Sequence, residues 1–370
     1  DPPADRRPRG LNENYARELL ELHTLGVDGG YDQQDVVEVA RAFTGWTLVP
    51  PRQLIDRRGA QRLEQARRMR GAGFVVGEDF LFRADAHDAG PKTVLGTKLA
   101  PGRGIEDGLQ VLDLVARHPS TARHLATKLA VRFVSDQPPA SLVDRLAETF
   151  TRTGGDLAAM VRTLAYSPEF WHPQEARRQK IKSPFELAAS ALRALDADAH
   201  HPRGVLHWIE RMGQPLYAYQ APTGYPDRAE FWVNSGALLS RMNFALELGS
   251  GAIPGVRFDL LALNGGREPE SLEEALEVYV PLLLPERDPR ETVQRLAPVV
   301  RDPELGRKIA AADTTPASSA YDDWELPESA DRPGRRGPGR DLWAPPPPEP
   351  TGPLGHVVGV ILGSPEFQRR

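Results

Sequence analysis

The 370-residue chain contains no cysteine. This absence excludes disulfide bonds, zinc sites built on thiolates and cysteine nucleophiles. It does not decide the cellular compartment, because a chain without cysteine is compatible with reducing and oxidising surroundings alike.

Long apolar runs are also missing. No run of eighteen apolar residues occurs, so we expect a protein that is not transmembrane. Apolar residues make up 40% of the chain and charged residues 26%, a composition typical of a soluble globular protein. The net charge of −5 is small, so we expect no nucleic-acid partner.

Several familiar motifs are absent as well. The sequence has no GxSxG elbow, no phosphate-binding P-loop and no dinucleotide glycine motif. The common hydrolase, nucleotide-binding and dehydrogenase signatures are therefore missing, which leaves an unfamiliar enzyme open. The first residue is an aspartate and no signal peptide precedes it, so we expect a processed, trimmed or truncated product.

Helical periodicity dominates what is present, and it predicts a mainly α multi-helix protein with a Pro-rich irregular segment. Asp32 is expected to cap one helix, and Ser183, Pro184 and Glu186 have the spacing of a capping box with proline at the first helical position. One small β-hairpin or extended element is expected around residues 74–96. The tripeptide SPE, at Ser167 and again at residue 364, predicts a short capped turn where a helix ends.

Composition also predicts how the chain is organised. We expect a flexible N-terminus over 1–10, one helical domain over 11–310 with an Arg-rich insert at about 50–72, a Pro-rich linker over 311–353, and a C-terminal helix within 354–370 docked on the body. Within the helical domain, two of the expected helices are 204–212 and 227–248.

The opening stretch NENYARELLELHTLGV, residues 12–27, is dense in polar chemistry. On an α-helix with about 100° per residue, Glu18 and His23 lie about 140° apart and cannot easily bind one ion together. Two interpretations of His23 remain open: a buried neutral histidine bonded to a backbone carbonyl, or a residue lining a pocket beneath the helix. The opposite ridge of Asn14, Glu18 and Glu21 is a candidate to face a cleft.

His87 and Asp88 form a second candidate pair, in a loop after an expected strand. A histidine and a carboxylate there suit a divalent metal or acid–base chemistry. Adjacent residues rarely share one ion, however, and Asp88 equally suits a turn before Gly90. Lys92 is a candidate for an anionic group, with an ordinary surface lysine as the alternative.

The segment GQPLYAYQAPTGYP, residues 213–226, is rich in aromatic and amide side chains. Such side chains suit stacking on a sugar or a flat ligand. They suit equally a loop pinned onto a helical core, and both interpretations stay open. The candidate ligand-binding residues here are Gln214, Tyr217, Tyr219, Tyr225 and Trp232.

Long motifs then show a resemblance. The motifs are NENYARELLELHTLGVDGGY, DVVEVARAFTGWTL, HDAGPKTVLG, HPSTARHLATKLAVRFV, KSPFELAASALRAL and the segment beginning GQPLYAYQ. Together they closely resemble the bacterial family called domain of unknown function 1800. The resemblance spans most of residues 11–248. It implies a helical protein that is usually exported, hence periplasmic or extracellular, although the absence of a signal peptide leaves the cytoplasm open. It also implies a partner from the domain of unknown function 1501 family, which resembles sulfatases and alkaline phosphatases.

Two functions follow as expectations. The first is an envelope-associated accessory or binding module that acts with the sulfatase- or phosphatase-like partner, or on a polysaccharide or other envelope polymer. The second is a metal-assisted hydrolase using His87, Asp88 and carboxylates of the opening helix. The candidate catalytic residues of this hydrolase are Glu18, Glu21, His87 and Asp88. Its candidate metal ligands are His87, Asp88 and His23. Further candidate ligand-binding residues are Asn14, Arg17 and Lys92. An enzyme should bring His87, Asp88 and a glutamate of the opening helix into one pocket, whereas a binding module needs only a groove with the aromatic residues from Tyr217 to Trp232 exposed along it.

Overall fold

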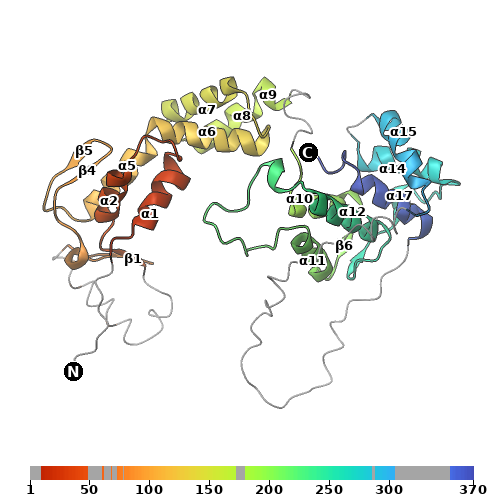
Figure 1. Ribbon diagram of the computed structural model, residues 1–370, viewed down its shortest axis with the longest axis horizontal. Helices are drawn as coiled ribbons and strands as arrows, with labels where there is room; N and C mark the ends of the chain where they lie inside the picture. Colours follow the sequence, from red (N-terminus) through yellow and green to blue (C-terminus); the bar gives the residue numbers. More distant parts are fainter. Residues whose placement is uncertain are drawn as a thin grey trace, which may run out of the picture. The chain divides into compact units, whose positions relative to one another are not determined.

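The computed structural model describes residues 10–48, 61, 68, 73–77, 79–171, 180–285, 288–304 and 351–370. Over these residues the protein is mainly α-helical with a few short strands (Figure 1), as predicted. Residues 1–9 of the predicted flexible N-terminus, most of the Arg-rich insert and residues 311–350 of the predicted Pro-rich linker lie outside the described residues. The end of that predicted linker is described, and a helix already begins there at Gly352.

The chain divides into two compact units. Unit 1 comprises Asp1–Phe133 and Pro138–Phe170, and unit 2 comprises Val134–Gln137 and Trp171–Arg370. The single helical body predicted over 11–310 stays a prediction, and each unit is described by itself.

Unit 1 combines helices with two small sheets. Its helices are α1 (Glu13–Glu18), η1 (Leu19–Thr24), α2 (Gln33–Ala42), η3 (Ala84–Ala86), α5 (Ile105–Ala116), α6 (Pro119–Phe133), α7 (Ala140–Thr153), α8 (Leu157–Ala165) and α9 (Pro168–Trp171), the last of which ends at the unit boundary. Its strands are β1 (Trp46–Leu48), β2 (Val75–Val76), β3 (Phe80–Phe82), β4 (Lys92–Val94) and β5 (Thr97–Leu99).

The strands of unit 1 fix both ends of the loop that contains His87 and Asp88. β2 and β3 pair antiparallel, which confirms the predicted hairpin, and β1 joins on the other side of β3. β4 and β5 form a separate antiparallel pair. Residues 83–91 therefore connect two sheets, and both ends of this loop are held by strands.

Helices α1, α2 and α5 enclose the core of unit 1. Ala16 and Leu20 from the opening segment meet Val36 and Val39 of α2 and Val111 of α5, all fully buried. α2 begins at Asp32, whose side chain accepts from the backbone of Asp35 in a capping box, as predicted.

Unit 2 is built almost entirely of helices. They are α10 (Pro184–Ala194), α11 (Arg203–Arg211), η4 (Ala229–Phe231), α12 (Ser235–Gly249), α13 (Leu260–Leu263), α14 (Leu272–Leu283), α15 (Pro289–Val300) and α17 (Gly352–Gly363). Strands β6 (Asp198–Ala199) and β7 (Val256–Arg257) pair antiparallel. The predicted capping box at the start of α10 is present, with Pro184 in the first turn.

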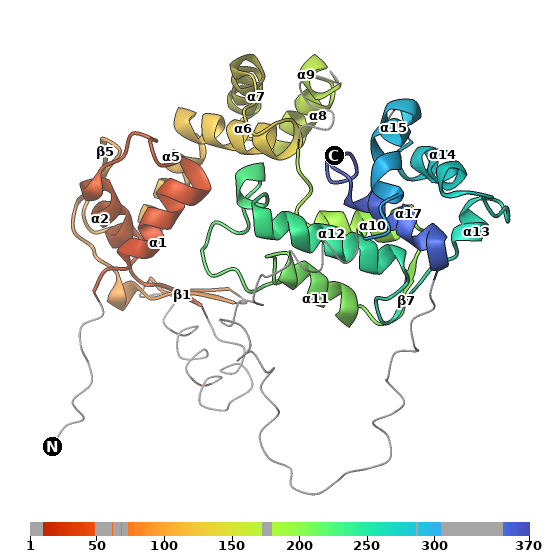
Figure 2. The ribbon, with the colours of Figure 1, turned by 45° about the vertical axis from the view of Figure 1, so that its right-hand side comes forward.

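Helix α17 packs directly against α12 in the core of unit 2, and the two lie side by side in both views (Figure 1, Figure 2). Glycines allow the close approach. A Cβ placed on Gly249 would lie 2.5 Å from the backbone of both Gly355 and Gly359. Any larger side chain at Gly249 would therefore push the two helices apart.

The helix predicted over 227–248 is wrong at its start. α12 begins only at Ser235, where the Asn234 side chain accepts from the backbone of Ala237 and caps the helix. The preceding residues form a loop with one 3₁₀ turn, η4. They are held there by a tertiary bond, because the Ala229 backbone donates to Oδ2 of Asp136 at 2.8 Å.

Candidate functional site

The opening helix changes its winding at Glu18. The α-helical turns of α1 give way to the π-helix η1, in which the backbone bonds to the fifth residue back. The Thr24 hydroxyl donates to the Leu19 carbonyl at 2.6 Å, and the Leu22 carbonyl lies 3.2 Å from Nε2 of His124. Burial lowers the pKa of His124, which favours a neutral ring that donates to Leu22.

The burial considered for His23 is wrong, because its side chain is exposed. The helical wheel assumed about 100° per residue throughout, but residues of a π-helix turn through a smaller angle. Glu18 and Glu21 are partly exposed, and Glu21 faces the Tyr31 hydroxyl at 3.5 Å. Arg17 instead donates to the side chain of Gln33 at 2.5 Å.

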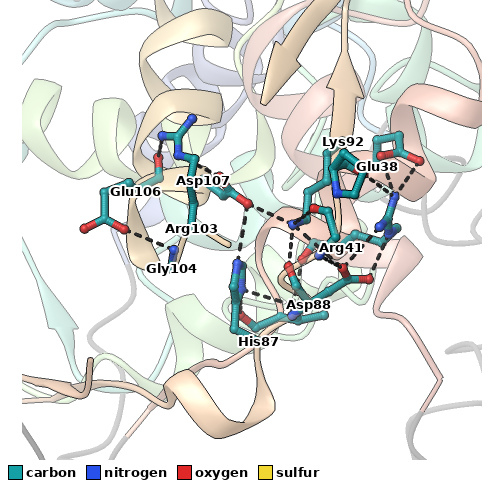
Figure 3. Close-up of polar contacts among 12 residues, drawn as sticks. Glu38, Arg41, His87, Asp88, Lys92, Arg103, Gly104, Glu106 and Asp107 are labelled. Carbon is teal, nitrogen blue, oxygen red and sulfur yellow. Dashed lines mark hydrogen bonds and ion pairs between the residues drawn. The ribbon is translucent and has the colours of Figure 1, made fainter. Parts of the chain in front are cut away.

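His87 lies in the loop between β3 and β4 (Figure 3). Its side chain is 2% exposed. Nδ1 lies 2.9 Å from the Thr44 carbonyl and 3.2 Å from the Thr44 hydroxyl, which itself donates to the Arg41 carbonyl at 2.6 Å. Because a carbonyl oxygen only accepts, Nδ1 carries a hydrogen and donates to the Thr44 carbonyl. Nε2 faces Oδ2 of Asp107 at 3.4 Å.

Lys92 and Asp107 form a fully buried ion pair beside His87. The Lys92 ammonium donates to Oδ2 of Asp107 at 2.8 Å, to the Gly90 carbonyl at 3.0 Å and to the Asp88 carbonyl. Nε of Arg103 lies 3.1 Å from the other oxygen of Asp107. Two cationic side chains thus offset the charge of one buried carboxylate. A charge buried in a low-dielectric interior is costly unless an opposite charge compensates it.

Asp88 points to the other side of the loop, toward α2 (Figure 3). Arg41 binds its carboxylate through two bonds, Nε to Oδ2 at 2.9 Å and Nη2 to Oδ1 at 3.1 Å. This bonding lowers the pKa of Asp88 to about 2. Asp88 also accepts from the Gly90 backbone at 2.8 Å, so it stabilises the turn as one interpretation proposed. Arg41 further bonds both oxygens of Glu38.

These contacts form an interlocked network rather than an open reaction centre. Among the described residues, no group of three or more histidine and acidic side chains could hold a metal ion. No hydrogen bond or ion pair in the described part of the chain joins Glu18 or Glu21 to His87 or Asp88. Arg41 engages the Asp88 carboxylate instead, and Lys92 engages that of Asp107.

A pocket of about 360 Å³ lies next to the network. Phe82 and Arg103 form its wall toward the buried groups: Phe82 packs edge-on against the His87 ring, with 5.4 Å between centroids, and Arg103 reaches Asp107. Sequence reasoning missed Thr44, Arg103 and Asp107. Asp107 resembles an ordinary acidic residue in the first turn of a helix, so only its burial marks it out.

The aromatic segment of unit 2 is partly buried and partly exposed. Trp232 is buried, and its ring lies 5.8 Å from that of Tyr225, which lies 4.5 Å from that of Tyr219. The Trp232 indole donates to the Pro226 carbonyl at 2.9 Å. At the other end, Tyr219 is 43% exposed and Tyr217 is fully exposed. The loop is thus pinned to the core and still presents two aromatic rings to solvent.

Further bonds fix this loop to the body of unit 2. Oε1 of the buried Gln214 accepts from the Phe185 backbone at 2.8 Å, at the start of α10. The buried ammonium of Lys180 binds the Asp136 carboxylate and the Asp227 carbonyl. We define residues 213–234, held by these contacts, as the aromatic loop.

Comparison with known proteins gives one match. The family described as "Protein of unknown function (DUF1800)" matches residues 2–369. No curated protein and no solved structure matches the chain. In the described part of the chain, no helix has the length and apolar character needed to cross a membrane.

Proposed function

The chain belongs to the DUF1800 family, and on that premise we propose that it is an accessory binding module of the bacterial cell envelope. It binds a polysaccharide through the aromatic loop and works beside a sulfatase- or phosphatase-like protein. The location and the partner rest on the family resemblance, whereas the binding surface rests on the aromatic loop.

The observation that carries the proposal is the exposure of Tyr217 and Tyr219 on an anchored loop. Tyr217 is fully exposed and has a φ of 63°, a left-handed conformation that costs a residue other than glycine on the order of 1–3 kcal/mol. Tyr219 packs on Tyr225, which packs on the buried Trp232. An exposed ring on such a fixed base loses little conformational entropy when it binds a ligand.

A flat, uncharged ligand face suits this surface best. Aromatic rings bind the apolar faces of sugars, while the neighbouring amide and carbonyl groups match hydroxyl groups. The hydrolase alternative has less support. Asp88 is held by Arg41, and His87 faces the Lys92–Asp107 pair, so a metal at His87 would lie beside a buried ammonium.

The test is co-sedimentation of the purified chain with insoluble polysaccharides, namely peptidoglycan sacculi, chitin and cellulose. We expect the wild-type chain to bind at least one of them. The double variant Tyr217→Ala/Tyr219→Ala should bind at least about tenfold more weakly, because aromatic anchors carry a large share of binding energy.

Tyr166→Ala is the matched control, since Tyr166 is 83% exposed but belongs to unit 1. It should bind like the wild type, and circular dichroism should show all three chains folded. Equal retention of the double variant, or no retention of the wild type on any polymer, would refute the proposal.

A further inference from the structure

Arg241 is a buried arginine with few polar contacts. It lies in the middle of α12, is 0% exposed and is the largest fully buried side chain among the described residues. Its Nη2 donates to the Lys182 carbonyl at 2.9 Å. Within the described residues, its Nε and Nη1 groups have no hydrogen-bond partner and no carboxylate forms an ion pair with it.

Such a group is costly to bury. Removing an arginine from water without a counter-charge costs several kcal/mol, and burial lowers the pKa of Arg241 to about 10. The charge of Glu186 acts in the opposite direction, but its carboxylate is already engaged. One oxygen accepts from the Ser183 backbone at 2.9 Å, and the other lies 3.4 Å from Nη2 of Arg370.

The surroundings of Arg241 are basic and close to solvent. The backbone of Lys182, to which Arg241 is bonded, donates to the Gln368 carbonyl at 2.8 Å, and the preceding residue pairs with Arg369. The Lys182 ammonium lies 3.9 Å above the centre of the Phe367 ring. Lys182, whose carbonyl accepts from the guanidinium, is itself partly exposed.

We propose that Arg241 is the central donor of an oxyanion site, which takes a carboxylate, sulfate or phosphate group of a ligand between α12 and residues 180–183. The anion bonds to the unpartnered N–H groups of Arg241, and the planar guanidinium suits such oxygens. It enters when the long side chain of Lys182 moves off the Phe367 ring, and that ammonium then provides a second positive charge. Arg241 and Lys182 lie outside the aromatic loop in the sequence.

The experiment is thermal unfolding of the full chain in dilute buffer with sodium sulfate, phosphate or acetate, each against sodium chloride of equal ionic strength. A ligand that binds only the folded state raises Tm. We expect at least one oxyanion to raise the Tm of the wild type by about 2 °C or more. The anion that gives the largest rise identifies the chemical group that the site prefers.

Arg241→Met fills the same space without charge, so we expect it to be at least as stable as the wild type in dilute buffer and insensitive to the oxyanions. Arg193→Met is the matched control, because Arg193 is an exposed arginine on α10 of the same unit. It should respond like the wild type, which separates the site from general salt effects.

Two results would overturn the proposal: no oxyanion-specific rise in the wild type, or an equal rise in Arg241→Met. If Arg241→Met does not fold, Arg241→Lys takes its place, because lysine keeps the charge but lacks the planar fork. Arg241→Lys should then show less than half of the wild-type rise, and a full rise would count against the site.

Discussion

Unit 1 contains one ion pair that is buried and another that is exposed to solvent. Lys92 and Asp107 are both fully buried, whereas Arg117 and Asp113 form an ion pair on the surface of the same unit, with 77% and 69% of their side chains exposed. The first pair lies in a low-dielectric interior and the second in water. Removing one partner of the buried pair should therefore lower the free energy of unfolding much more than removing one partner of the surface pair.

We expect Lys92→Met to lower the free energy of unfolding by about 3–5 kcal/mol, because it leaves Asp107 buried with less compensation. Arg117→Met should change it by less than about 1 kcal/mol. Urea titration of both variants measures the difference. If Lys92→Met lowers the free energy of unfolding no more than Arg117→Met does, the buried pair does not stabilise this loop.

At this scale the sequence predicted part of the network. His87, Asp88 and Lys92 stand close together in the chain and were identified as candidates. Thr44 and Asp107 were not, because they lie 43 and 15 residues away from their partners and nothing local marks them. Whether a histidine or a lysine is buried depends on the packing of distant segments, which one sequence does not display.

The sequence correctly predicted the helix caps and capped turns, which depend on residues close together in the chain. The capping boxes of α2 and α10 are present as expected. The two SPE turns are also confirmed, since Ser167 and Ser364 each accept from the backbone of the phenylalanine three residues later. The π-helix η1 and the late start of α12 were missed, because tertiary bonds to His124 and Asp136 accompany them.

The turn after η1 provides a test at this scale. Gly26 has a φ of +87°, and a Cβ on it would lie 2.8 Å from Nδ1 of His124. Gly30 has a φ of +89° with nothing within 4 Å of its added Cβ. Gly30→Ala should therefore cost only the backbone strain, about 1 kcal/mol. Gly26→Ala should cost about 1–3 kcal/mol more, as measured by urea unfolding.

The double variant Gly26→Ala/His124→Ala distinguishes the cause of that extra cost. Removing the imidazole should bring the effect of Gly26→Ala close to that of Gly30→Ala. If the additional cost persists without His124, the contact between the turn and α6 is not its origin.

For the whole molecule, the division into two units does not follow the order of the chain. The segment Val134–Gln137 lies between α6 and α7 of unit 1 but belongs to unit 2. Composition does not mark the boundary at residue 134, although Pro138 and the next proline stand directly after the segment. The bonds of Asp136 to Lys180 and to the Ala229 backbone tie this segment to unit 2.

A fragment of residues 171–370 would therefore lack one anchor of the aromatic loop. We expect its amides over 226–234 to exchange hydrogen faster than in the intact chain. Asp136→Asn in the intact chain should produce the same change, because it weakens the bond to Lys180. The control is Asp144→Asn, which removes the exposed partner of Arg123.

Hydrogen-exchange mass spectrometry measures all three changes. Unchanged exchange over 226–234 in both the fragment and Asp136→Asn would mean that the loop is held without Asp136. Faster exchange in Asp144→Asn would mean that the effect is not specific to this anchor.

The glycine contact between α12 and α17 has a consequence for biosynthesis. Gly249 is made before residue 352, where α17 begins 103 positions later in the chain. At about 5–20 residues per second, translation takes roughly 5–20 s to cover that span. Throughout this interval α12 is without the helix that completes its core, so the nascent chain displays an apolar surface for which we expect chaperones to compete.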